Sequence, residues 1–145
     1  MKYFEDYQPG DVYKSPHGRT ITEADIVNFC MFSGDWYPLH SDKEYAAKTP
    51  FGQRIAHGML VLSATSGLWP LKDMAIVAFY GLDKVRFLAP TMIGDTLYVE
   101  IEALEKSDKG DMGGVVTFNS RVRNQKNEDV AMSILKIFLA KKPVK

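Results

Sequence analysis

Residues 57–69 read His-Gly-Met-Leu-Val-Leu-Ser-Ala-Thr-Ser-Gly-Leu-Trp, a mostly apolar stretch that is followed by Pro70. Apolar side chains would fall on nearly all sides of a helix built from this stretch, and such a helix is normally buried. A helix of about thirteen residues is roughly 20 Å long, which is the right length to lie across one sheet. We therefore expect a central helix over 57–69.

The second half of the chain supplies the strands for that sheet. A strand is expected at 75–88, and strands in which apolar and polar residues alternate with a period of two are expected at 97–103, 116–123 and 130–140. Gly81 is expected to form a bulge in the first of them, and turn residues at 109–111 and 124–129 indicate hairpins. The pattern predicts an α+β fold in which one curved antiparallel sheet wraps around one buried helix. Its open edges favour dimerisation.

Two shorter helices are expected before the central one. Thr22 is a typical N-cap, the acidic residues after it suit a helix N-terminus, and Gly34 is well placed to end this helix. The spacing Ser41-x-x-Glu44 is a capping-box pattern for a second helix over 43–48.

Composition narrows the classes of protein. The 145 residues, whose formal net charge is zero, are expected to form one domain over 1–145. Neutrality removes the simplest electrostatic argument for nucleic acid or an anionic membrane as partner. Cys30 is the single cysteine, which excludes an internal disulfide and a multi-cysteine zinc site. We find no signal peptide and no apolar run long enough to span a bilayer, so a cytoplasmic location is expected.

Asp35 and His40 are the best candidates for chemistry. They flank Trp-Tyr-Pro-Leu, and Pro38 excludes a continuous helix between them, so a tight loop can bring both side chains to one point. A carboxylate and an imidazole that converge can hold a water molecule and move its protons near neutral pH. The other interpretation is that Asp35 caps the loop and that His40 bonds locally.

Gly58 and Ser66 lie on the expected central helix. The first helical turn has free N–H groups, and a glycine there lets a ligand approach the backbone. A carbonyl bound at the Gly58 amide would have its developing oxyanion stabilised; close packing is the alternative role. The Ser66 hydroxyl needs a partner, either the carbonyl four residues back or Asp35.

The remaining site candidates are aromatic or histidine side chains. Trp36, Tyr37 and Phe51 flank the site and are candidates to line an acyl pocket, or else they pack the loop onto the core. His57 is a further candidate for contact with substrate, or it caps its helix. The histidines show no metal-ligand spacing, so no metal is expected.

The chain resembles the MaoC-like hydratase family, the R-specific enoyl-CoA hydratases of the hot-dog fold. The resemblance is carried by Phe-Ser-Gly-Asp-x-x-Pro-Leu-His at 32–40 and Pro-Phe-Gly-x-Arg-Ile-Ala-His-Gly-Met at 50–59, and it covers about residues 10 to 140. It implies that Asp35 and His40 activate water. It also implies that the Gly58 amide binds the thioester oxygen and that Ser66 hydrogen-bonds the aspartate.

One position departs from the family pattern, which usually reads Gly-Asp-x-Asn-Pro-Leu-His. Tyr37 stands where asparagine is expected. A bulky phenol there can narrow the pocket or offer a hydroxyl to a polar acyl group, so the departure bears on the class of substrate.

Three functions follow from these residues. The leading one is hydration of a trans-2-enoyl-CoA, or the reverse dehydration, in a homodimer or larger homo-oligomer. It requires no cofactor, because coenzyme A is part of the substrate. The second is an acyl-CoA thioesterase, although residues 59–69 contain no acidic side chain. The third is a non-catalytic subunit that binds acyl-CoA.

Overall fold

The sheet is built mainly from the second half of the chain, as the alternating pattern predicts. The computed structural model describes residues 1–144. Its strands are β1 (Val12–Lys14), β2 (Arg19–Thr20), β3 (Ile76–Phe87), β4 (Thr96–Asp108), β5 (Gly114–Arg123) and β6 (Asp129–Leu139). All pair antiparallel in the order β1-β4-β5-β6-β3, and β2 pairs with the end of β4. A register shift between Phe79 and Gly81 confirms the bulge in β3.

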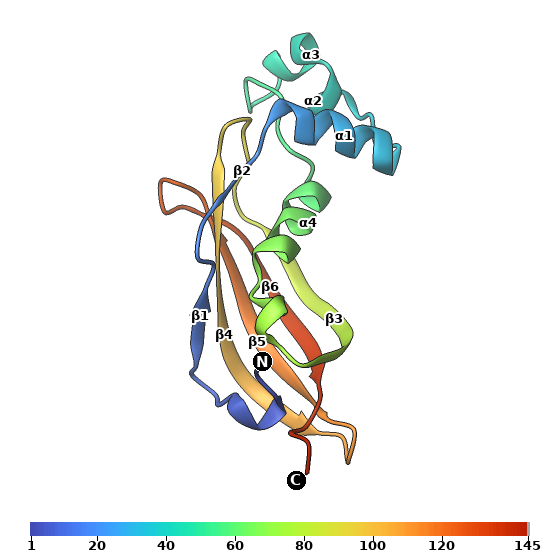
Figure 1. The fold of residues 1–145 in the computed structure, drawn as a ribbon. Coiled ribbons are helices and arrows are strands. Elements are labelled where there is room, and N and C mark those ends of the chain that lie inside the picture. The colour runs from blue at the N-terminus through green and yellow to red at the C-terminus, as the bar shows by residue number, and fades with distance from the viewer. Residues whose placement is uncertain (145) are drawn as a thin grey trace.

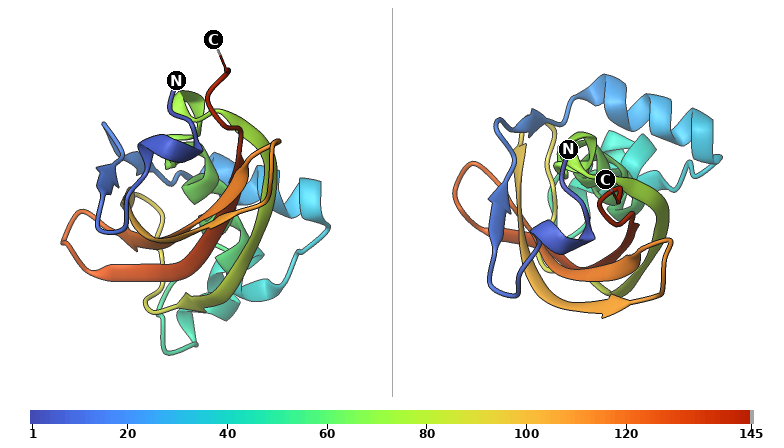
Figure 2. Two further views of the ribbon diagram at one scale, coloured as in Figure 1. Left: turned by 90° about the horizontal axis from the view of Figure 1, so that it is seen from below. Right: turned by 60° about the horizontal axis from the view of Figure 1, so that its bottom comes forward.

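The central helix α4 (Gly58–Leu68) lies along the concave side of this sheet, which curves around it in Figures 1 and 2. Leu60, Val61 and Leu68 are buried against the sheet. At the end of the helix the buried Trp69 indole N–H donates to the Ser120 hydroxyl on β5, at 2.9 Å. This bond fixes the C-terminal end of α4 against the middle of the sheet.

The prediction that α4 is buried on all sides is wrong for one of its faces. Met59 is 60% exposed, and Ser63, Ser66 and Gly67 are also exposed. The sheet covers only the opposite side of the helix, so the face that carries these residues is open in a single copy of the chain.

Three helices gather at one end of the sheet, beside the N-terminus of α4 (Figure 1): α1 (Glu23–Ser33), α2 (Pro38–Ser41) and α3 (Lys43–Ala47). As predicted, Thr22 caps α1 by accepting from the Asp25 amide, and Gly34 ends it in the left-handed region, with φ of 75°. The predicted capping box at Ser41 is wrong. Asp42 caps α3 instead, because its carboxylate accepts from the Glu44 and Tyr45 amides.

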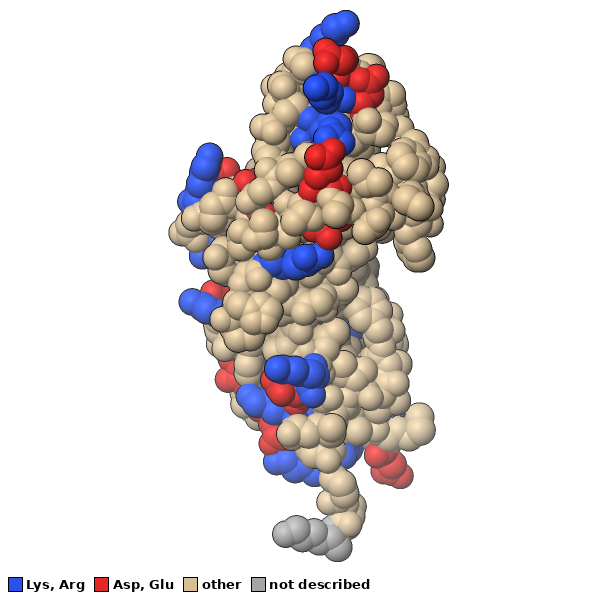
Figure 3. Space-filling view, turned by 45° about the horizontal axis from the view of Figure 1, so that its top comes forward, with Lys and Arg blue, Asp and Glu red and all other residues tan. Residues whose placement is uncertain are grey.

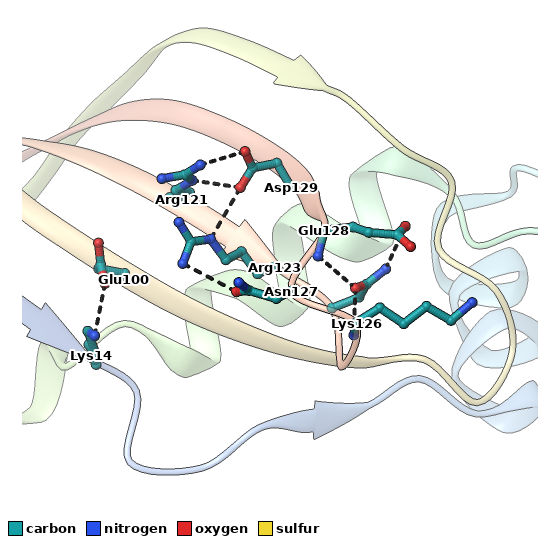
Figure 4. A network of polar contacts seen from close by, with 9 residues as sticks. Lys14, Glu100, Arg121, Arg123, Lys126, Asn127, Glu128 and Asp129 are labelled. Atoms are coloured by element: carbon teal, nitrogen blue, oxygen red, sulfur yellow. Dashed lines mark hydrogen bonds and ion pairs between the residues drawn. The ribbon is translucent and has the colours of Figure 1, made fainter.

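The outer face of the sheet carries ion pairs interspersed with apolar side chains, such as Tyr98 beside Arg123 and Met132 beside Arg121. Asp129 binds Arg121 in a bidentate pair and also contacts Arg123, while Lys14 pairs with Glu100, as Figure 4 shows. In the view of Figure 3 positive and negative side chains are interspersed among uncharged ones. Within residues 1–144, no helix is both long and apolar enough to cross a membrane.

Strand β3 forms one edge of the sheet, and apolar side chains remain exposed along it. Val77, Phe79 and Tyr80 are 50%, 54% and 61% exposed. An edge strand presents unpaired N–H and C=O groups that can pair with another strand. This edge, with Met59 on the open face of α4, exposes apolar side chains that the described part of the chain leaves uncovered.

Candidate active site

His40 is held by a neighbouring segment of chain that is remote in sequence. It lies in α2, a single helical turn that Pro38 begins and that replaces the loop expected from the sequence. Its Nδ1 lies 2.7 Å from the Ile55 carbonyl, and the Ile55 amide donates back to the Leu39 carbonyl at 3.3 Å. Since a carbonyl only accepts, Nδ1 carries the hydrogen. The Nε2 lone pair is therefore free to accept a proton.

Asp35 lies in the extended segment between α1 and α2. Its Oδ1 accepts from the Tyr37 amide at 3.1 Å, and its own amide donates to the Ser33 hydroxyl. Side-chain ligand atoms of Asp35, His40 and His57 all lie within 4.8 Å of one another. The expected convergence of the carboxylate and the His40 imidazole is therefore present in the fold.

Gly58 is the first residue of α4, so its amide has no helical carbonyl to bind. A groove of about 350 Å³ borders it, lined mainly by apolar residues that include Phe51, Phe87 and Val130. A Cβ added at Gly58 would lie 2.9 Å from the Phe87 ring. Glycine at this position therefore lets the Phe87 ring pack directly against the backbone beside the groove, which is the close-packing role considered from the sequence.

The predicted pocket-lining residues separate into two groups. Phe51 lines the groove beside Gly58. Trp36 and Tyr37 are about half exposed and do not line it. The Tyr37 hydroxyl lies 3.4 Å from that of Tyr45, and its ring contacts the His40 ring edge-on at 6.3 Å between centroids. Tyr37 therefore borders Asp35 and His40 rather than the groove.

Ser66 does not support Asp35 within one copy of the chain. Its hydroxyl is exposed and donates to the Ser63 carbonyl at 2.6 Å. The reason is the length of the helix. Ser66 lies eight residues beyond Gly58, about 12 Å along the axis, whereas Asp35 contacts His57 at the start of α4. The local backbone bond considered from the sequence is the one formed, with a carbonyl three residues back rather than four.

His57 is the most enclosed side chain of the site, with 2% of its surface exposed. Its Nε2 lies 3.0 Å from the Asp35 carbonyl, and its ring stacks on that of His40 with centroids 3.9 Å apart. Its Nδ1 is buried and has no hydrogen-bond partner among the described residues. Burial lowers the pKa of His57, with the nearby His40 adding to the effect, so this imidazole is neutral near pH 7.

The same three side chains form the one cluster in residues 1–144 whose composition could suit a metal ion. The His40 and His57 rings, however, are only 25° from parallel and stacked. Ring lone pairs lie in the ring planes, so those of two stacked rings run side by side and do not converge on one ion. His57 Nε2 and His40 Nδ1 are also engaged by carbonyls. The arrangement suits proton transfer better than metal ligation.

Sequence reasoning missed the residues that hold the site together from a distance. Ile55 supplies the carbonyl for His40, and Phe87 on β3 closes over Gly58. Thr91 lines the groove and receives the Ala56 amide on its carbonyl, while its buried hydroxyl has no partner among the described residues. Ile55 lies inside the motif at 50–59, but the sequence does not indicate these roles, because they depend on which segments meet.

The neutral state of His57 predicts how stability depends on pH. In the unfolded chain the imidazole takes up a proton near pH 6.5, whereas in the folded chain its pKa is lowered. The unfolded state therefore binds more protons below about pH 6.5, and stability falls on acidification with a limiting slope of about 1.4 kcal/mol per pH unit. Denaturant unfolding between pH 7.5 and about pH 5, at one protein concentration, measures this slope.

The slope should be shallower in His57→Gln, which removes the titrating group. His17 is exposed, so His17→Gln should keep the wild-type slope. Equal slopes for the wild type and His57→Gln would show that His57 is protonated as readily in the folded chain as in the unfolded one.

Known proteins that are similar to this chain in sequence have names of MaoC, dehydratase or hydratase type. The chain is 44% identical over 109 residues to Protein MaoC of Klebsiella aerogenes, matching 74% of this chain and 32% of that protein. It is 35% identical to a 3-hydroxybutyryl-CoA dehydratase of Methylorubrum extorquens (71% of this chain, 64% of that protein). It is 37% identical to an (R)-specific enoyl-CoA hydratase of Rhodospirillum rubrum (67% and 66%). The match thus spans about a third of the first relative and just under two thirds of the other two.

Solved structures agree on the fold. A monoamine oxidase regulatory protein of Archaeoglobus fulgidus superposes with a TM-score of 0.91 at 40% identity, covering 98% of this chain and 96% of that one. An R-hydratase of Pseudomonas aeruginosa gives 0.76 at 31% identity, covering 97% and 86%. A double hot-dog protein of Mycobacterium tuberculosis gives 0.86 at 22% identity, covering 99% and 46%, which shows the fold alone. The family model described as MaoC like domain matches residues 5–125, and the chain therefore belongs to the MaoC-like domain family with a hot-dog fold.

Proposed function

We propose that this protein hydrates trans-2-enoyl-CoA thioesters to (R)-3-hydroxyacyl-CoA, or catalyses the reverse dehydration. The observation that carries the proposal is the meeting of the Asp35 and His40 side chains at the N-terminus of α4. The names of relatives in the family, an (R)-specific enoyl-CoA hydratase and a 3-hydroxybutyryl-CoA dehydratase, support the same reaction class.

The tautomer of His40 supports its role as a base. With Nδ1–H bound to the Ile55 carbonyl, Nε2 presents its lone pair. A water molecule between Nε2 and the Asp35 carboxylate would lose a proton to this pair as its oxygen bonds to C3 of the substrate. The pair then delivers a proton to C2, so that one water is added in all.

The Gly58 amide and the adjacent groove support binding of a thioester. Addition of water at C3 moves negative charge onto the thioester oxygen, and an unpaired N–H at a helix N-terminus stabilises that charge. The apolar groove of about 350 Å³ beside it suits an acyl chain. Phe51 and Phe87 then lie along the acyl chain, and Tyr37 lies near the reacting atoms.

A homodimer is part of the proposal. The exposed apolar side chains of β3 lie on an edge strand that has no further partner in the described residues. Pairing of two such edges would continue the sheet across both copies and bury these side chains. It would also bring a second chain close to Phe87, which borders the groove.

Two other functions would give different results in the same assays. A thioesterase would release free coenzyme A thiol from saturated acyl-CoA, but α4 presents no acidic residue near the substrate. A non-catalytic binding subunit would bind acyl-CoA tightly without turnover. The hydratase proposal requires loss of the ultraviolet absorbance of the conjugated thioester.

Substitution of the acid/base pair tests the mechanism. Asp35→Asn and His40→Gln should each lower kcat with crotonyl-CoA, or with a longer or branched enoyl-CoA, by at least ~10²-fold, because each removes one proton acceptor. His17→Gln, at an exposed histidine that hydrogen-bonds only the Gly18 carbonyl among the described residues, should leave the rate unchanged. Full activity in a folded Asp35→Asn variant would refute the assigned role, and absence of turnover by the wild type with every enoyl-CoA would refute the function.

Substitution of Gly58 tests the oxyanion contact. Gly58→Ala adds a methyl group against Phe87 at the point where the thioester must approach, so kcat/KM should fall by about 10-fold or more, as a displaced reacting group predicts. Gly67→Ala is the matched control in the same helix, because a Cβ there meets nothing within 4 Å. Equal activity of the two variants would argue against binding at the Gly58 amide.

The dimer is tested by a charge on the edge strand. Val77→Lys on β3 should convert a dimer to a monomer in size-exclusion chromatography with light scattering, because a lysine on an edge opposes strand pairing. Val12→Lys is the control, since Val12 is equally exposed (49% against 50%) on β1 at the opposite edge. A wild-type monomer, or loss of the dimer in both variants, would contradict pairing through β3.

A further inference from the structure

His57 contacts both members of the catalytic pair, although the proposed reaction gives it no proton to move. Its Nε2 is 3.0 Å from the Asp35 main-chain carbonyl, and its ring lies 3.9 Å from the His40 ring at 25°. It also meets two residues of α1: the Phe29 ring, with centroids 4.9 Å apart, and the Cys30 sulfur, which lies 3.5 Å from the same Nε2. The ring is thus clamped between α1 and the catalytic segment.

The hydrogen bonds define its tautomer. The Asp35 carbonyl can only accept, so Nε2 carries the hydrogen, and the buried Nδ1 has no partner in the described residues. Adding a proton at Nδ1 would bury an unpaired N–H and place a cation against the His40 ring. The titratable groups that face the ring are Asp35, His40 and Cys30, and burial raises the pKa of the Cys30 thiol, which stays uncharged.

These contacts restrain the pair in complementary directions. The hydrogen bond from Nδ1–H to the Ile55 carbonyl fixes one edge of the His40 ring. That bond alone leaves the ring free to rotate about the N–H···O axis. The stacked His57 ring blocks this rotation. The Nε2–H bond holds the Asp35 backbone, while the exposed Asp35 side chain is held by the Tyr37 amide, which donates to its Oδ1.

We propose that His57 is a positioning residue for the acid/base pair, which it holds in place through the Nε2–H bond to the Asp35 backbone and the stack on the His40 ring. This inference rests on the proposed hydratase function for its kinetic consequence only. It replaces the expectation that His57 binds substrate, because only 2% of the His57 surface is exposed.

Two substitutions distinguish the contribution of the Nε2–H bond from that of the ring stack. His57→Phe keeps a ring to stack on His40 and loses the N–H, whereas His57→Gln keeps an N–H donor and loses the ring. Each should lower kcat by ~10- to 10²-fold, with KM within about threefold of the wild type, as expected when a reacting group is displaced by about 1 Å. Leu68→Ala is the control for lost stability, since Leu68 is buried near the far end of the same helix, and it should keep the wild-type kcat at a temperature where it is folded.

NMR spectra test the proposal without a measurement of enzyme turnover. In ¹H–¹⁵N spectra, the His40 ring signals should shift and broaden in His57→Gln and change less in His57→Phe. The amide signals of 35–37 should shift in His57→Phe. A raised KM with unchanged kcat would assign His57 to substrate binding, and unchanged spectra in both variants, or an equal kcat loss in Leu68→Ala, would overturn the proposal. If the wild type lacks hydratase activity while the spectra change as described, the proposed function fails and the positioning role stands.

Discussion

The hydrogen bond from His40 Nδ1–H to the Ile55 carbonyl joins the two segments on which the site depends. At 2.7 Å it is a short bond, and the Ile55 amide returns a second one to the Leu39 carbonyl. The pair of bonds ties the segment that carries Asp35 and His40 to the segment that leads into α4. Together with the His57 bond to the Asp35 carbonyl, this pair of bonds fixes Asp35 and His40 relative to the Gly58 amide. The same bond selects the His40 tautomer, so a single contact serves both structure and chemistry.

The sheet provides a rigid support for these two joined segments. Helix α4 is buried on one side, and the Trp69 indole anchors its C-terminal end to Ser120. At its N-terminal end the Ala56 amide binds the Thr91 carbonyl just before the helix starts. A helix held at both ends can present its first free amide to a ligand without first being ordered, which is the basis of electrostatic preorganisation.

Two energetically unfavourable features of the fold lie close to the candidate site. The two buried side-chain polar atoms without a partner in residues 1–144 are His57 Nδ1 and the Thr91 hydroxyl, one beside Asp35 and His40 and one at the groove. The exposed apolar side chains of β3, with Met59 on the open face of α4, form a second such feature. Folded domains tolerate such costs mainly where function or association requires them.

The sequence by itself determined the elements and the family. The Thr22 cap, the Gly34 end of α1, the helix at 58–68 and the alternating strands follow from side chains within a few residues of one another, and the fold and the approach of Asp35 to His40 followed from them. Only the tertiary structure decided which face of α4 is open and which partners His40, His57 and Ser66 find. The reason is physical. Helix and strand periodicity is a local property, whereas contacts such as the one between Asp35 and His57 join residues 22 positions apart and exist only once the packed sheet has brought their segments together.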